Sequence, residues 1–297
     1  MTRTKIQVLL AILNGEKFLK EFLESLANQR SVDVYLIVSD DGSADRTLEI
    51  LNSYAEVFSS VEIHSGPRRG HSANFDYLMT LRKPGIPVAF ADQDDIWEPN
   101  KLIVLSESLP KNEPALLFSK VRVLGTNSIF PNSLKAARYS HLFQNKAMGC
   151  TQLLTPELCS ILDNLQRPIS VDFDWWNYIV ASELGVSKAI DYPLVKYRLH
   201  ENNTVGIPSK FTRLKRVFYG YLRHRSVLSP QFLGIIDAQE KLSQMISISS
   251  GFDDYLNDLN FEKLVRAIRE KHFRDSFVEN LYVCGLLIVY RMKIRNE

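Results

Sequence analysis

Four short segments of β-strand length, separated by helical patterns, dominate the first third of the sequence. They lie at 6–13, 35–38, 61–64 and 88–91, and all but VEIH at 61–64 are mainly apolar. Apart from Gln7, the first segment is a continuous apolar run, which is typical of a strand that is buried on both faces. Between the runs, apolar residues recur at helical spacing, as at 18–26, 48–54 and 75–81. This alternation predicts an α/β fold with a mainly parallel sheet flanked by helices.

Polar residues follow three of these runs, at 14–15, 40–43 and 92–95. In sheets of this kind, ligands bind beyond the carboxyl ends of the strands. We therefore expect the three polar segments to converge on one crevice.

The third polar segment, in AFADQDDIW, carries Asp92, Asp94 and Asp95. Carboxylates at this spacing after a strand can bind a hard cation such as Mg²⁺ or Mn²⁺. Such a cation offsets the charge on a departing diphosphate. The alternatives are a solvated acidic turn and a phosphatase of the haloacid-dehalogenase type. That phosphatase has its aspartates after the first strand, which this chain does not.

The second polar segment, Asp40-Asp41-Gly42-Ser43, consists of residues that favour turns and helix caps. A turn with a cap is therefore one interpretation. The other is that a carboxylate of this segment accepts a hydrogen bond from the imide N–H of a pyrimidine base.

The ordered motifs together resemble family-2 glycosyltransferases of the GT-A (Rossmann-like) fold, and in particular their bacterial rhamnosyltransferase-like branch. The motifs are VLLAILNGEKFLKEFLESLANQ, IVSDDGSADRTLEIL, FADQDDIWEPNKL, DFDWW and YRLHENNTVG. The resemblance implies a GT-A catalytic domain over 1–206 and a C-terminal helical region over 207–297. It also implies an inverting enzyme that moves a sugar, such as L-rhamnose from dTDP-L-rhamnose, to a hydroxyl of a bacterial surface glycan such as lipopolysaccharide core or O-antigen.

The same resemblance assigns residues to the donor site. Asp41 would contact the base, Gly70 would bring the backbone close to the nucleotide, and Asp92 would face the ribose or the metal. The implied nucleotide contacts are Ala11, Leu13, Asn14, Asp41, Gly70 and Asp92.

Asp94 and His200 are the metal ligands that the resemblance implies, with Mg²⁺ or Mn²⁺ as the cofactor. Asp174 is the candidate general base, because an inverting transfer needs a carboxylate opposite the leaving diphosphate. The alternatives are a structural histidine at 200 and a helix cap at 174. The chain departs from the family at Phe173, where histidine is more usual.

The three tryptophans, Trp97, Trp175 and Trp176, each lie beside an acidic motif. Aromatic faces stack on sugar rings, so these residues are candidates for the acceptor site. Core packing is the alternative.

Residues 207–225 hold six basic residues and no acidic one, which favours a basic helix on an anionic membrane or a solvated helix against the protein. We expect a cytoplasmic enzyme, associated peripherally with the inner face of the membrane, whose acceptor is a saccharide or lipid-linked glycan. Nucleic acid is not an expected partner. Two other hypotheses are a silent nucleotide-sugar-binding scaffold and a nucleotidyltransferase, although the chain lacks the glycine-rich phosphate loop of the latter.

Overall fold

The computed structural model describes residues 3–134, 139–200, 258, 260–270, 272–274, 280–281 and 283–288. Within this part of the chain, contacts divide the protein into two compact units. The first comprises residues 1–132, 147–166 and 173–206, and the second comprises 133–146, 167–172 and 207–297.

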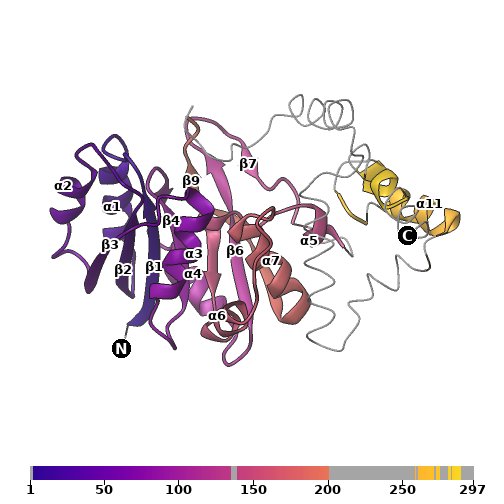
Figure 1. Ribbon diagram of the computed structural model, residues 1–297, viewed down its shortest axis with the longest axis horizontal. Helices are drawn as coiled ribbons and strands as arrows, with labels where there is room; N and C mark the ends of the chain where they lie inside the picture. The colour runs from indigo at the N-terminus through magenta and orange to yellow at the C-terminus, as the bar shows by residue number, and fades with distance from the viewer. Residues whose placement is uncertain are drawn as a thin grey trace. The chain divides into compact units, whose positions relative to one another are not determined.

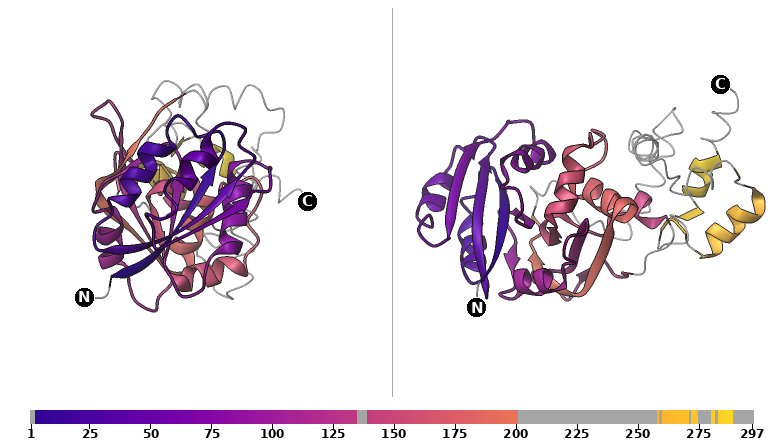
Figure 2. Two further views of the ribbon diagram at one scale, coloured as in Figure 1. Left: turned by 90° about the vertical axis from the view of Figure 1, so that its left-hand side faces the viewer. Right: turned by 90° about the horizontal axis from the view of Figure 1, so that it is seen from below.

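The N-terminal half of the first unit is a parallel sheet in the order β3-β2-β1-β4 (Figure 1). The strands are β1 (Thr4–Ile12), β2 (Val32–Asp40), β3 (Ser60–Ser65) and β4 (Val88–Asp92). Residues 6–12 of β1 are all buried, because strands cover it on both sides and helices cover its faces. The left view of Figure 2 shows the twist of these strands. The four predicted strands are confirmed.

The register of these strands brings their carboxyl ends level. Ala11 lies opposite Ser39 on one side and Asp92 on the other, and Asp40 lies opposite Ser65. The loops that follow β1, β2 and β4 therefore leave the sheet at the same edge, as the polar strand ends predict.

Beyond β4 the sheet becomes mixed and reaches nine strands. The order continues through β8 (Gln152–Leu154), β6 (Ala115–Val123), β9 (Val186–Tyr197) and β5 (Ile96–Trp97), and β7 (Ile129–Phe130) pairs with β6. β8 is antiparallel to both β4 and β6, whereas β6 and β9 are parallel. The parallel arrangement that the sequence predicts therefore describes the N-terminal half, and the second half adds antiparallel strands.

Helices pack against this sheet and complete the α/β architecture. In the first unit they are α1 (Leu19–Ala27), α2 (Thr47–Asn52), α3 (His71–Leu81), α4 (Lys101–Ser108), α6 (Pro156–Asp163), α7 (Phe173–Leu184) and the short 3₁₀ helix η1 (Gly149–Thr151). α3 contacts β1 and β2, and α7 contacts β6 and β9. Between α3, β4 and α7, the rings of Phe75, Phe90 and Phe173 form an aromatic cluster with centroids 4.2–5.6 Å apart.

The second unit contains α5 (Ser140–Phe143) and α11 (Phe261–Glu270). Phe273 is fully buried and packs against Tyr139 and Phe143. The Asn280 side-chain amide accepts the Phe273 N–H and donates to the Ala267 carbonyl. It thereby provides hydrogen-bond partners for backbone groups in the last turn of α11 and just beyond it.

The basic stretch 207–225, and the boundary expected at 206/207, lie outside the described residues. Of the apolar stretch 281–290, residue 281 and residues 283–288 are described and helical. Among the helices that the structure describes, none has the length and apolar character needed to cross a membrane.

Replacing Thr155 by valine should destabilise the protein by about 1–3 kcal/mol. The buried Thr155 hydroxyl caps α6, accepts the Ala115 N–H at 2.8 Å and donates to the Glu113 carbonyl at 2.9 Å. Valine keeps the shape but leaves these buried groups without partners. Urea unfolding measures the loss. The control is Thr80→Val on the exposed side of α3, which should change the free energy of unfolding by less than about 0.5 kcal/mol.

Candidate active site

The loops after β1 and β2 are joined by reciprocal hydrogen bonds. The Asn14 N–H donates to Ser43 Oγ at 2.9 Å, and the Ala44 N–H donates to Asn14 Oδ1 at 2.8 Å. The Gly15 N–H donates to Thr47 Oγ1 at 2.7 Å. Backbone N–H groups of each loop thus find side-chain acceptors in the other segment, so hydrogen bonds tie the two predicted nucleotide-binding segments together.

The two aspartates of the second segment have different roles. Asp40 caps its own turn by accepting the N–H and the hydroxyl of Ser43. Asp41 instead reaches the loop before α3, where its carboxylate accepts the Arg68 N–H at 2.6 Å and the Gly70 N–H at 3.1 Å. Gly70 has φ +89°, a conformation that favours glycine. Asp41 therefore holds the predicted Gly70 contact in place, and each of its oxygens keeps a second lone pair for a base N–H.

Gln93 connects the acidic turn to the β1 loop. Its side chain accepts the Leu13 N–H at 2.9 Å and donates to the Leu13 carbonyl at 2.8 Å. A Cβ atom added to Gly15 would lie 2.3 Å from Gln93 Oε1, so a side chain at position 15 would have to displace the Gln93 amide from Leu13. Together with the bonds above, Gln93 makes the ends of β1, β2 and β4 a single framework.

Asp94 and His200, the predicted metal ligands, lie next to each other. Asp94 Oδ2 and His200 Nε2 are 2.6 Å apart, and the His200 ring stacks on Phe18 with centroids 5.1 Å apart. Arg198 lies over the same Phe18 ring and donates through Nε to the Asp94 carbonyl at 3.0 Å. Burial and the charge of Asp92 raise the pKa of Asp94, and His200 opposes this effect.

Asp92 is held by a histidine as well. His71 Nε2 lies 2.9 Å from Asp92 Oδ1, and the His71 ring contacts Phe75 and Phe173. Phe173, where the resembling family has histidine, belongs to the aromatic cluster. The imidazole that lies beside both Phe173 and Asp92 comes from α3 in this chain.

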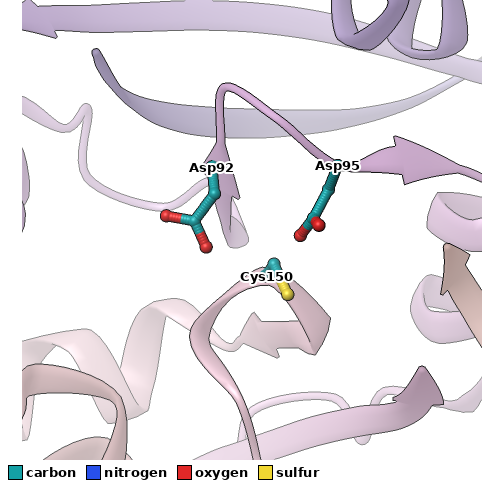
Figure 3. A group of neighbouring side chains, drawn as sticks. All are labelled: Asp92, Asp95 and Cys150. Carbon is teal, nitrogen blue, oxygen red and sulfur yellow. The ribbon is translucent and has the colours of Figure 1, made fainter. Parts of the chain in front are cut away.

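Asp95, Cys150 and Lys101 form a buried group next to the acidic turn. Figure 3 shows Asp95 and Cys150 of this group together with Asp92. Burial and the charges of Asp92 and Asp94 hold the pKa of Asp95 well above its ordinary value, and burial likewise raises the pKa of the Cys150 thiol. Lys101 Nζ donates to the Cys150 carbonyl at 2.6 Å and lies over the Trp97 ring. Burial holds the pKa of Lys101 well below its ordinary value.

Asp174 lies in the first turn of α7 and is connected to this buried group through η1. Its carboxylate accepts the Gly149 N–H at 3.0 Å and the Trp175 N–H at 2.7 Å. Gly149 directly precedes Cys150, whose thiol lies beside Asp92 and Asp95. The structure therefore brings the predicted base and the acidic turn to neighbouring positions.

The tryptophans are nearly completely buried, with 2%, 7% and 4% of Trp97, Trp175 and Trp176 exposed. Trp97 packs edge-on against Phe22 in the core. Little ring surface is left for a sugar to stack on, so core packing describes their environment in this structure.

The donor set of the acidic turn fits a divalent cation. Asp92 and Asp94 keep 25% and 15% of their side chains exposed, and His200 keeps 21%. Carboxylate oxygens and an imidazole nitrogen are ligands that suit Mg²⁺ or Mn²⁺. Among the described residues, the group of three close ligands consists of Asp92, Asp95 and Cys150, while Asp94 and His200 form a separate pair.

Sequence comparison decides the family. The profile described as "Glycosyl transferase family 2" matches residues 7–161, which is more than half of the chain. This chain belongs to glycosyl transferase family 2. The enzyme is similar to the dTDP-rhamnosyl transferase RfbG of Shigella flexneri, with 27% identity over 73% of this chain and 80% of that protein. It is also 25% identical to the UDP-Glc:alpha-D-GlcNAc-diphosphoundecaprenol beta-1,3-glucosyltransferase WfgD of Escherichia coli, over 71% of this chain and 83% of that protein.

Solved structures confirm the GT-A fold. The S. aureus TarS 1-349 complex with UDP-GlcNAc matches 90% of this glycosyltransferase and 79% of that chain, with a TM-score of 0.56 and 17% identity. The mannosyltransferase PcManGT of Pyrobaculum calidifontis, in complex with GDP-Man and Mn²⁺, matches 98% of this chain and 87% of that one, with a TM-score of 0.53 and 15% identity.

Several residues of the site were not predicted from the sequence. Gln93 and Lys101 lie within the motif FADQDDIWEPNKL, in which only the acidic residues and the tryptophan were assigned roles. His71 directly follows the predicted Gly70 in RRGHSANF. Cys150 and Gly149 carry no local signal, because only the folding of η1 against β4 brings them to the acidic turn.

Asp95→Asn should change how the stability of the metal-free protein depends on pH. Because the pKa of Asp95 is raised, the native state keeps a proton that the unfolded state loses above about pH 3.8. The wild-type free energy of unfolding therefore falls as the pH rises from that value through the native pKa, by up to about 1.4 kcal/mol per pH unit for one carboxyl. The variant lacks this contribution, so its stability relative to wild type should rise with pH.

Urea titrations in a chelator at several pH values measure this difference. The matched control is Glu56→Gln, which removes an exposed carboxyl and should leave the pH dependence close to that of wild type. Parallel curves for wild type and Asp95→Asn would contradict the prediction.

Proposed function

We propose that this family-2 glycosyltransferase transfers a sugar with inversion from a nucleotide diphosphate donor to a hydroxyl of a bacterial surface glycan, with Asp174 as the general base. The observation that carries the proposal is the short path from Asp174 through Gly149 and Cys150 to Asp92 and Asp95. A base and a diphosphate site on neighbouring elements are what an in-line displacement requires.

The nucleotide is proposed to lie along the joined ends of β1, β2 and β4. Ala11, Leu13 and Asn14 would offer backbone and small polar contacts, while Asp41 accepts an imide N–H of the base. Gly70 has no side chain to prevent close approach of the loop. Asp92 would face the ribose or the metal. The hydrogen bonds that join these loops hold the pocket in one geometry before the donor arrives, which lowers the entropic cost of binding.

Asp94 and His200, with Asp92, would hold Mg²⁺ or Mn²⁺, which supplies charge neutralisation for the departing diphosphate. Asp174 would take the proton of the acceptor hydroxyl as that oxygen attacks the sugar. The two N–H donors on its carboxylate, from Gly149 and Trp175, keep the side chain in one orientation. A fixed orientation favours proton removal because catalysis depends on alignment of the reacting atoms.

The donor is proposed to be dTDP-L-rhamnose, supported by the similarity to a dTDP-rhamnosyl transferase. The acceptor is proposed to be lipopolysaccharide core or O-antigen, carried on a lipid. A relative named for a diphosphoundecaprenol-linked acceptor supports a lipid-linked glycan. The basic stretch 207–225 would favour peripheral contact with the inner face of the cytoplasmic membrane.

Asp174→Asn should lower the rate of sugar transfer by about 10²–10⁴-fold, the usual contribution of general base catalysis. Asparagine keeps the size and a hydrogen-bond-accepting oxygen, so the donor should still bind. Transfer to an acceptor glycan and donor binding are measured on the same samples. Glu157→Gln, in the first turn of α6, is the matched control and should retain transfer. Equal turnover of Asp174→Asn and wild type would remove Asp174 from the mechanism.

Donor hydrolysis without acceptor distinguishes an enzyme from a silent binder.

Manganese and a nucleotide sugar together should raise the melting temperature more than either alone. A ligand at about 100 times its Kd stabilises a folded protein by about 2.7 kcal/mol. A thermal-shift screen of dTDP-, UDP- and GDP-sugars, with and without Mn²⁺, ranks the donors. Asp94→Asn should abolish the manganese-dependent part of the shift, whereas the exposed Asp191→Asn should keep it. A manganese-dependent shift that persists in Asp94→Asn would exclude Asp94 as a ligand.

A further inference from the structure

Cys150 creates a second set of potential metal ligands next to the acidic turn. One ligand atom each from Asp92, Asp95 and Cys150 lies within 4.8 Å of the others. Figure 3 shows the carboxylates of Asp92, at the end of β4, and of Asp95, in the turn that follows, on the side of this turn where Cys150 lies. Neither the resemblance nor the comparisons assign a role to this cysteine.

Asp95 provides an independent sign that a ligand is needed here. The residue is 1% exposed, and its Oδ1 accepts the Arg198 N–H at 3.2 Å. Its Oδ2 is buried and accepts no N–H or O–H hydrogen bond from the described residues, so the neighbouring Cys150 thiol, a weak donor, is the partner that it has. A buried carboxylate oxygen without a strong donor costs free energy, and a cation at this position would supply a stronger partner.

The dimensions of the group suit a small tetrahedral ion. Zinc binds sulfur at about 2.3 Å and carboxylate oxygen at about 2.0–2.2 Å, so its ligand atoms are about 3.5 Å apart. The present separations, all within 4.8 Å, exceed this by about 1.3 Å at most, so binding requires the side chains to draw together by that amount. Asp92 is partly exposed, which leaves an entry path and room for a water as fourth ligand.

The chemistry of the group differs from that of Asp94 and His200. A soft thiolate selects zinc-like ions over Mg²⁺ and Mn²⁺, which prefer oxygen. Two carboxylates and one thiolate carry a charge of −3. A divalent cation offsets two of these three charges, and the Lys101 amine lies beside the group, where it donates to the Cys150 carbonyl.

We propose that Asp92, Asp95 and Cys150 bind a thiophilic divalent cation of the zinc type, and that the bound ion inhibits transfer by withdrawing Asp92 from the donor site. Binding replaces the S–H bond of Cys150 by a sulfur–metal bond and the O–H bond of protonated Asp95 by an oxygen–metal bond, and both protons go to solvent, with no change in oxidation state. The inhibition rests on the proposed glycosyl transfer, whereas the binding does not.

Cobalt tests the binding directly, because Co²⁺ can replace Zn²⁺ and absorbs in the near ultraviolet only when a thiolate coordinates it. The full-length wild-type protein should develop this charge-transfer band, and Zn²⁺ should displace it. Cys150→Ser should lose the band and bind Zn²⁺ more than about tenfold more weakly, since loss of even an outer partner costs about that much. Cys159→Ser, the matched control with an equally buried thiol on α6, should keep both.

Asp94→Asn should also keep the cobalt–thiolate band, because Asp94 belongs to the other set of ligands. If Cys150→Ser does not fold, Asp95→Asn serves as the second variant and should weaken the band. A wild-type protein without the band, or a band that survives in Cys150→Ser, would overturn the proposed site.

Inhibition is measured as the ratio of manganese-supported transfer with and without Zn²⁺, separately for each variant. Zinc should reduce transfer at least about tenfold in wild type and Cys159→Ser, and much less in Cys150→Ser. A thiolate band combined with unaffected transfer would retain the site and reject its inhibitory role. Loss of transfer in every sample would count against the proposed function, while the cobalt spectra would still decide the site.

Discussion

The mutual repulsion of carboxylates at the end of β4 is the constraint on which the rest of the site depends. Asp92, Asp94 and Asp95 follow one another within four positions, and burial makes their negative charges costly. In the folded protein, each of the three carboxylates has a different partner. His71 lies against Asp92, His200 lies against Asp94, and a backbone N–H from Arg198 reaches Asp95. These partners come from α3 and from the chain after β9. The repulsion among three neighbouring carboxylates is therefore offset only when segments distant in sequence pack against the acidic turn.

That packing also explains the arrangement of the aromatic side chains. Phe18 supports His200 and Arg198 on one side of the acidic turn. On the other side, the aromatic cluster of Phe75, Phe90 and Phe173 supports His71 and the start of α7. The catalytic aspartate proposed at 174 directly follows Phe173, so packing in the core sets the position at which that carboxylate emerges. Substitutions in this cluster would act on the site through geometry as well as through stability.

Features that depend on residues close together in the sequence could be predicted from it, whereas features that depend on contacts between distant segments could not. The strands and helices up to residue 92 were predictable because hydrophobic periodicity is local, and the convergence of strand ends follows from the parallel topology. The antiparallel β8 was not predicted, since three residues carry no periodic signal. Cys150 and Gly149 gave no sign of their position, because their role depends on contacts with distant segments. The burial of Trp97, Trp175 and Trp176 was left open by the sequence, since a tryptophan beside an acidic motif suits either core or surface.

The two hydrogen bonds between the Gln93 side chain and the Leu13 main chain fix the backbone at the end of β1 but place no constraint on the Leu13 side chain. Gln93 contacts only the main-chain N–H and carbonyl of Leu13, and the Leu13 side chain remains 46% exposed. At Gly15, two positions later, a side chain would meet the Gln93 amide itself. The side chain at 13 can therefore be exchanged while the path of the loop stays the same. One amide thus fixes the main chain at this strand end and leaves the neighbouring side chain free to vary.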